Sequence, residues 1–285
     1  MIEWLNVLVF ADGSTQGIAR ALSAREICLT SSAARLNVYV PLLMPVRSYG
    51  YGAAMMSGAY DESRAHAQAQ AERQLNLLRD ALMSSADKVR LSLLAAEAAF
   101  ASRVAASLGR STDLVVIGQQ TSASTHLDAL LMQGALMGSG RPCLVLPAWP
   151  APRRLGRRAV IAWKGTPEAA RAVRDSLPLL QKAERVRIFA AGEEPGMEGE
   201  GADGLTRLAG YLTMHGVVVE PPALTAPPDE LTSTAGDAIL AEVEGFGADL
   251  LVMGGFGHSR WSEVVFGGAT VKVLREANCA VLMSH

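Results

Sequence analysis

Glycine residues gather in two places near the C-terminus of this sequence. Gly254, Gly255 and Gly257 follow an apolar segment, and Gly267 and Gly268 precede an amphipathic one. Glycine permits positive φ and leaves backbone amides uncovered. Free amides at a helix N-terminus, together with the helix dipole, favour an anion. The pattern therefore indicates an anion site, and the alternative is that these glycines are only turn residues.

Side chains that could assist in binding an anion lie in the same segment. Ser259 and Thr270 supply hydroxyl donors, and His258 and Arg260 could supply positive charge. A phosphate-binding P-loop needs GxxxxGK[ST], which is absent from the sequence. A Rossmann fingerprint needs GxGxxG after the first strand of a unit. The run from Gly255 reads GxGxxR and follows a fourth strand, so neither of these motifs explains the cluster.

Two parts of the chain have similar sequences. Residues 113–118 read DLVVIG and residues 249–254 read DLLVMG, an offset of 136 residues. Cys143 begins CLVL and Cys279 begins CAVL at the same offset. An ungapped match at both ends of such a span indicates an internal duplication.

The sequence pattern of each repeat predicts five strands that alternate with helices. The strands are expected near 5–11, 36–42, 89–94, 113–118 and 143–147, and again near 158–163, 185–191, 216–221, 249–254 and 279–283. Short, continuous apolar strands that alternate with helices are typical of a parallel sheet with right-handed crossovers. The fold class is therefore α/β, with two repeated five-stranded parallel-sheet domains.

The segment 148–158, which reads AWPAPRRLGRR, divides the chain into predicted domains at 1–150 and 155–285, because it combines charge with residues that disfavour regular structure. The longest helix is expected over 61–83. Glycine-rich loops are expected over 48–60 and 192–204.

Composition excludes several functional classes. The formal net charge of −2 gives no electrostatic case for nucleic-acid binding. No apolar run reaches the length of a membrane helix. Cys28, Cys143 and Cys279 are widely spaced, which favours a reduced, cytoplasmic protein. The five histidines have no metal-ligand spacing, so no metal site is expected.

The spacing Gly254-x2-Gly257-x9-Gly267 resembles the nucleotide-binding motif G-2x-G-9x-G-(S/T) of the universal stress protein family. The opening VLVFADGS, residues 7–14, resembles the first strand of that family. The whole chain is similar to a tandem universal stress protein. The resemblance implies adenine nucleotide alpha hydrolase-like, Rossmann-like sandwich domains. It also implies that the strands beginning at Cys143 and Cys279 pair as an intramolecular pseudo-dimer.

The same resemblance implies a site for ATP, with ADP or AMP as alternatives and Mg²⁺ as an optional companion. The phosphate and ribose side would be lined by Gly254, Gly257, His258, Ser259, Gly267, Gly268, Ala269 and Thr270. The adenosine would lie near Ala162, Trp163 and Lys164. Two positions depart from the family: Gly268 replaces Ser or Thr, and Lys164 replaces aspartate. Lys164 could contact a phosphate or point into solvent.

The first repeat keeps an aspartate, Asp12, but loses the glycines. At the offset of 136, Gly255, Gly257, Gly267 and Gly268 correspond to Gln119, Thr121, Leu131 and Met132. The first repeat is therefore expected to be a degenerate site that serves folding and dimerisation.

The resulting hypothesis is a stress-response or regulatory module that binds one adenine nucleotide in its C-terminal domain. The sequence leaves open whether the protein also forms a homodimer or binds an unidentified protein partner. An interaction protein without a ligand is the alternative. A slow ATPase is the weakest reading, because Glu263 is the sole carboxylate in or beside the glycine segment.

Overall fold

A computed structural model describes residues 3–29, 31–46, 53–83, 87–148, 155–191, 200–225, 234–255 and 268–285. The chain forms two compact units: a first unit, Trp4–Arg141, and a second unit that contains Pro142–His285. Among the described residues, no helix combines the length and the apolarity that crossing a membrane requires.

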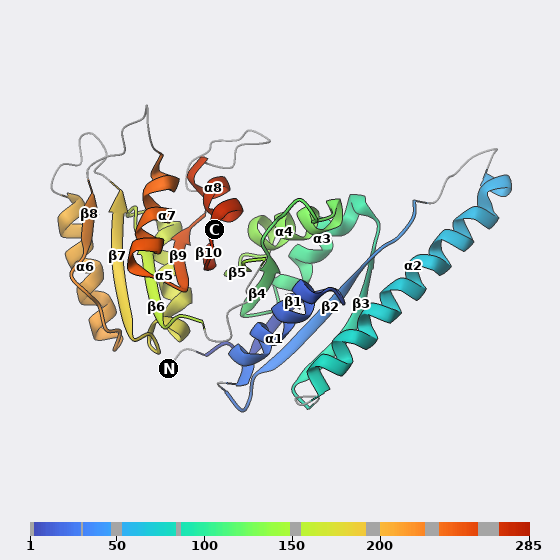
Figure 1. Cartoon of the computed structure of the whole chain (residues 1–285), viewed down its shortest axis with the longest axis horizontal. Coiled ribbons are helices and arrows are strands. Elements are labelled where there is room, and N and C mark those ends of the chain that lie inside the picture. The colour runs from blue at the N-terminus through green and yellow to red at the C-terminus, as the bar shows by residue number, and fades with distance from the viewer. Residues whose placement is uncertain are drawn as a thin grey trace. The chain divides into compact units, whose positions relative to one another are not determined.

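The first unit is a parallel sheet with helices on both sides (Figure 1). Its strands are β1 (Asn6–Phe10), β2 (Arg35–Leu43), β3 (Val89–Ala96) and β4 (Leu114–Gly118), in the spatial order β3-β2-β1-β4. Its helices are α1 (Thr15–Leu29), α2 (Ala53–Leu82), α3 (Ala98–Gly109) and α4 (His126–Gly138). Leu8, Leu36 and Leu114 are fully buried at its centre, as expected for strands covered on both faces.

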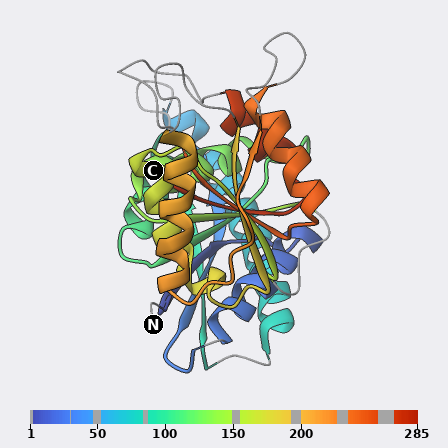
Figure 2. The ribbon, with the colours of Figure 1, turned by 90° about the vertical axis from the view of Figure 1, so that its left-hand side faces the viewer.

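The second unit repeats this order and gains one strand. Its strands are β5 (Cys143–Leu146), β6 (Arg158–Ala162), β7 (Arg185–Ala191), β8 (Ala223–Thr225), β9 (Leu250–Gly254) and β10 (Ala280–Ser284). Its helices are α5 (Pro167–Leu180), α6 (Glu200–Met214), α7 (Ala235–Phe246) and α8 (Gly268–Glu276). The spatial order is β5-β10-β9-β6-β7-β8. Figure 2 shows α6 and α7 on opposite sides of these strands.

The strand β5 belongs to the first repeat in sequence but lies in the second unit. It pairs antiparallel with β10, with Val145 opposite Val281 and Leu144 opposite Leu282. The pairing expected between the CLVL and CAVL segments is therefore present. Along the chain, the main segment of the second compact unit begins at Pro142. The domain boundaries predicted from the sequence pattern, 1–150 and 155–285, remain a prediction.

The repeated aspartates make the same contact in both units. Asp113 Oδ2 accepts hydrogen bonds from the amides of Leu5 and Asn6, each at 2.8 Å. Asp249 accepts from the amides of Arg157 and Arg158, at 3.1 and 3.0 Å. Each carboxylate thus ties the start of one strand to the start of its neighbour. The similarity of the two DLxVxG segments has a structural cause at this end.

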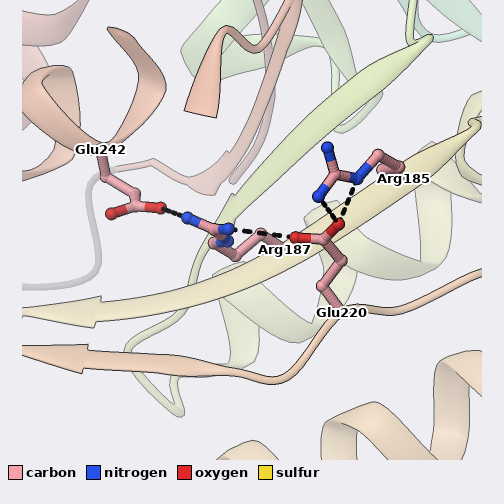
Figure 3. A network of polar contacts seen from close by, with 4 residues as sticks. All are labelled: Arg185, Arg187, Glu220 and Glu242. Carbon is pink, nitrogen blue, oxygen red and sulfur yellow. Dashed lines mark hydrogen bonds and ion pairs between the residues drawn. The ribbon is translucent and has the colours of Figure 1, made fainter. Parts of the chain in front are cut away.

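The amino-terminal edge of the second sheet is held by a charged network (Figure 3). Arg187 donates to Glu220 at 3.0 Å and to Glu242 at 2.9 Å, and Arg185 also pairs with Glu220. The Arg187 guanidinium carbon lies 4.3 Å from the centre of the Phe246 ring. The network fixes the last turn of α7 against β7.

Three sequence predictions of local structure were wrong in whole or in part. The third strand of the second repeat was expected over 216–221, but only Val219 forms a bridge there, to Val186, and β8 lies at Ala223–Thr225. The helix α2 begins at Ala53, inside the loop expected over 48–60. The expected loop over 192–204 overlaps the start of α6 at Glu200, and residues 192–199 lie outside the described part.

Candidate anion-binding site

The carboxyl ends of three strands lie side by side in the second unit. Ala162 at the end of β6 pairs with Met253 of β9, and Gly254 pairs with Ser284 of β10. Trp163 follows β6 directly, and its amide donates to Phe189 O of β7 at 2.8 Å. Ligands of open parallel sheets bind at this edge, so these strand ends define the candidate site.

Gly254 is required by the packing of a helix. A Cβ at this position would lie 2.5 Å from the amide nitrogen of Ala169 and 2.8 Å from the carbonyl carbon of Glu168. Both atoms are backbone of the first turn of α5, which cannot move aside as a flexible side chain could. The absence of a side chain at Gly254 therefore allows α5 to approach the strand end.

Gly255 does not offer the free amide that its sequence position suggests. Its amide donates to Ser284 O at 2.9 Å, and its carbonyl lies 3.3 Å from Nδ1 of His285. Neither Gly254 nor Gly255 adopts positive φ. The expectation that these two glycines provide uncovered amides with unusual φ was wrong at Gly255, because the adjacent strand β10 uses that amide.

The N-terminus of α8 has different surroundings. No described residue lies within 4 Å of a Cβ built at Gly268, the first residue of this helix. Ala269 lies beside Gly236 of α7, with 3.2 Å between the Ala269 Cα and a Cβ built at Gly236. Thr270 is only 6 % exposed, so its side chain is not a surface donor. Among the described residues, none therefore fills the position beside Gly268 at the start of this helix.

Helices α5 and α7 have carboxylates at their own N-termini. Thr166 caps α5 by accepting from Ala169 N at 3.3 Å, and Glu168 lies in its first turn. The pKa of Glu168 is lowered, first by a hydrogen bond from its own backbone amide. Burial opposes this shift, and a hydrogen bond with Thr166 adds to it. The positive end of the α5 dipole is therefore already matched by a negative charge.

Asp237 likewise places a carboxylate at the N-terminus of α7. Thr234 and Asp237 form a reciprocal capping box, in which Asp237 Oδ2 accepts from the Thr234 amide at 2.8 Å. Asp237 also pairs with Lys272 of α8 at 2.7 Å. The Lys272 contact, with the Thr234 hydrogen bonds, lowers the pKa of Asp237. By contrast, α8 has no acidic residue in its first turn.

Of the residues expected near the adenosine, Trp163 lies beside α6. The indole Nε1 of Trp163 is 3.6 Å from a Cβ built at Gly204, so a small residue of α6 faces the Trp163 ring. Ala162 and Trp163 are half-buried, and Lys164 is exposed. Gly257, His258, Ser259 and Gly267 lie outside the described residues, so their place at the site remains a prediction.

The sequence analysis did not identify Glu168 or His285 at this edge. His285 lies beside Gly255, and its charge contributes to lowering the pKa of Glu168. The Thr166-Pro167-Glu168 segment carries a recognisable helix-start signal, which could have located Glu168. No local signal marks His285, because its neighbours come from β9 and α5.

In the first unit, the helix that corresponds to α8 is α4, and its start differs from that of α8. Leu131 and Met132, the counterparts of Gly267 and Gly268, are buried inside α4. That helix begins with a capping box formed by Thr125 and Asp128. Its N-terminus therefore carries an internal carboxylate where α8 has none.

The fold and the position of this edge define a class of protein. Both units have the 3-2-1-4 strand order of a doubly wound α/β fold, and the second has its switch point between β6 and β9. Residues 157–285 match the model of the universal stress protein family.

Two solved structures resemble nearly the whole chain. A universal stress protein from Archaeoglobus fulgidus DSM 4304 is 15% identical, with a TM-score of 0.64 over 97% of this chain and 94% of that one. A functionally unknown protein from Pseudomonas aeruginosa PAO1 is 14% identical, with a TM-score of 0.59 over 98% of this chain and 92% of that one. No curated protein sequence matches the chain. At these identities the structures establish a shared fold.

Proposed function

We propose that the protein binds one adenine nucleotide, with ATP as the first candidate, at the carboxyl edge of the second unit, and that it acts as a stress-response or regulatory module. The observation that carries this proposal is the N-terminus of α8. Among α5, α7 and α8, it is the helix start without a carboxylate in its first turn, and Gly268 leaves space beside it. A phosphate would supply the missing negative charge.

In this proposal, the phosphates lie at the α8 amides of Gly268 and Ala269. Gly257, His258, Ser259 and Gly267 are assigned to the same phosphate and ribose side by their family motif, and Thr270 supports α8 from a buried position. The adenosine lies toward Ala162 and Trp163, and exposed Lys164 can reach a phosphate. Gly254 contributes by allowing α5 to close the strand end. ADP and AMP remain alternative ligands, and Mg²⁺ an optional companion of the nucleotide.

A second function, an interaction protein without a ligand, is favoured by one specific observation. Packing alone accounts for Gly254, through Ala169, and the amide of Gly255 is occupied by Ser284. These two glycines therefore do not require a nucleotide. Hydrolysis has less support, because Glu168 and Asp237 are both engaged in helix capping.

The test begins with the purified full chain, which is denatured so that any released nucleotide can be identified by chromatography and mass spectrometry. Calorimetric titration with ATP, ADP and AMP then compares Gly268→Val with Gly268→Ser. We expect the valine variant to lose binding, because its branched side chain covers the amides. The serine variant, which restores the hydroxyl of the family motif, should bind at least as well as the parent.

Both variants should unfold at nearly the parental temperature, since no described residue lies within 4 Å of the added Cβ. A chain that releases no nucleotide and gives no binding heat with any of the three would favour the interaction protein. Equal affinities for the two variants would move the phosphates away from α8.

A further inference from the structure

The side chain of Arg20, from α1, lies at the carboxyl ends of β1 and β4 in the first unit, where open parallel sheets form their ligand crevice. Its Nη1 donates to the carbonyl of Phe10, the last residue of β1, at 2.6 Å. A Cβ built at Gly118, the last residue of β4, would lie 2.3 Å from Nη2 and 2.5 Å from Cζ of Arg20. The guanidinium therefore rests directly on the Gly118 backbone, at the switch point of the first sheet.

Two carboxylates act on this guanidinium. Burial lowers the pKa of Arg20, and the charges of Asp12 and Asp128 counteract part of that effect. Both carboxylates are themselves fixed: Asp12 Oδ1 accepts from Ser14 Oγ at 2.6 Å, and Asp128 Oδ2 accepts from the Thr125 amide at 2.8 Å. The crevice thus presents a carbonyl, two anchored negative charges and a flat glycine surface. These features suit a planar cation that has several N–H donors.

We propose that the first unit carries a binding site for a guanidinium-type cation, and that the chain's own Arg20 is its resident ligand. The described residues of the second repeat do not form the same arrangement. At the offset of 152, Ala172 stands where Arg20 stands, and Lys164 stands where Asp12 stands. Backbone of α5 covers Gly254, the counterpart of Gly118.

The occupied crevice gives the first unit a property beyond the loss of its glycines. Arg20, Asp12 and Asp128 together carry a formal charge of −1, so the edge repels a phosphate in addition to being filled. The first unit is therefore closed to a nucleotide by a built-in side chain. This inference does not depend on whether the second unit binds a nucleotide.

Chemical rescue tests the proposal. Arg20→Ala in the full chain empties the crevice and should lower the melting temperature. Methylguanidinium chloride, titrated at millimolar concentrations, should then raise the melting temperature of this variant by at least about 2 °C in a saturable manner. Potassium chloride at the same ionic strength should not reproduce the rise.

The parent protein and Arg79→Ala are the matched controls. Arg79 is an exposed arginine of α2 in the same unit, so its removal leaves no buried space of guanidinium shape. Methylguanidinium should leave both controls unchanged. An equal response of all three proteins, or no response of Arg20→Ala, would overturn the proposed site.

A double-mutant comparison covers the case in which Arg20→Ala does not fold. Gly118→Ala places a Cβ where the guanidinium rests and should lower the melting temperature in the parent. In an Arg20→Lys background, which keeps the charge but not the planar group, the same change should have little further effect. Additive losses would show that Arg20 is not seated on Gly118.

Discussion

Gly254→Ala is predicted to destabilise the protein although it adds only one methyl group. The new Cβ would lie 2.5 Å from Ala169 N and 3.0 Å from Ala169 Cα. Both are backbone atoms at the start of α5, so the helix or the strand end must shift. Overpacking of this kind costs about 1–3 kcal/mol of the free energy of unfolding. Each kcal/mol corresponds to a fall of about 2–4 °C in melting temperature for a domain of this size.

The assay is thermal unfolding followed by circular dichroism, with Gly268→Ala as the matched control. No described residue lies within 4 Å of a Cβ at Gly268, and alanine is the better helix former. The control should therefore raise the free energy of unfolding by up to about 1 kcal/mol. Gly254→Ala with parental stability would refute the close contact between β9 and α5. In that case packing would not explain the glycine at position 254, and ligand binding would remain as its explanation.

Three further predictions address other parts of the fold. Phe246→Leu should lower the free energy of unfolding by about 1–2 kcal/mol in urea titrations. Leucine keeps much of the buried volume, but it loses the ring contacts with Arg158, Arg185 and Arg187. An unchanged urea midpoint would contradict this prediction. The pKa of Asp237 is lower in the folded state, so its stabilisation is present above the ordinary aspartate pKa near about 3.9 and disappears as the pH falls through the folded value. Asp237→Asn should accordingly flatten the loss of stability below pH about 4 in acid titrations, and an unaltered acid limb would speak against this. Burial raises the pKa of Cys28 and of Cys279 to about 12, so neither thiol should react with a disulfide reagent at pH 8 until denaturant is added, whereas prompt reaction of the native protein would show that these residues are accessible.

The strands that are buried on both faces were predictable from sequence. Continuous apolar runs gave β1, β4, β9 and β10 to within one or two residues. The strand β8 was misplaced because Val217–Val219 has the stronger strand propensity, yet Val218 is exposed and pairing resumes only after Pro221 and Pro222. A short strand with one neighbour depends on tertiary contacts more than on propensity.

The candidate site was predictable only in part. The glycine spacing predicts a role for the segment before α8, and this stays a prediction because residues 256–267 lie outside the described part. The roles of Gly254 and Gly255 were not predictable, because Ala169 and Ser284 lie far from them in sequence and meet them only through the sheet. Arg20 was missed for the same reason. A lone arginine in an alanine-rich helix gives no sign that it reaches the ends of two strands.

The pairing of β5 with β10 determines where this chain can be divided. A fragment cut at the repeat boundary, 155–285, would lack β5 and leave one side of β10 without its partner, exposing the apolar strand that carries Val281 and Met283. Such an edge invites pairing with another copy. A fragment that begins at Pro142 would keep β5 on that side of β10. The last strand predicted for the first repeat is thus part of the second compact unit, so the two predicted repeats do not correspond to two separable pieces.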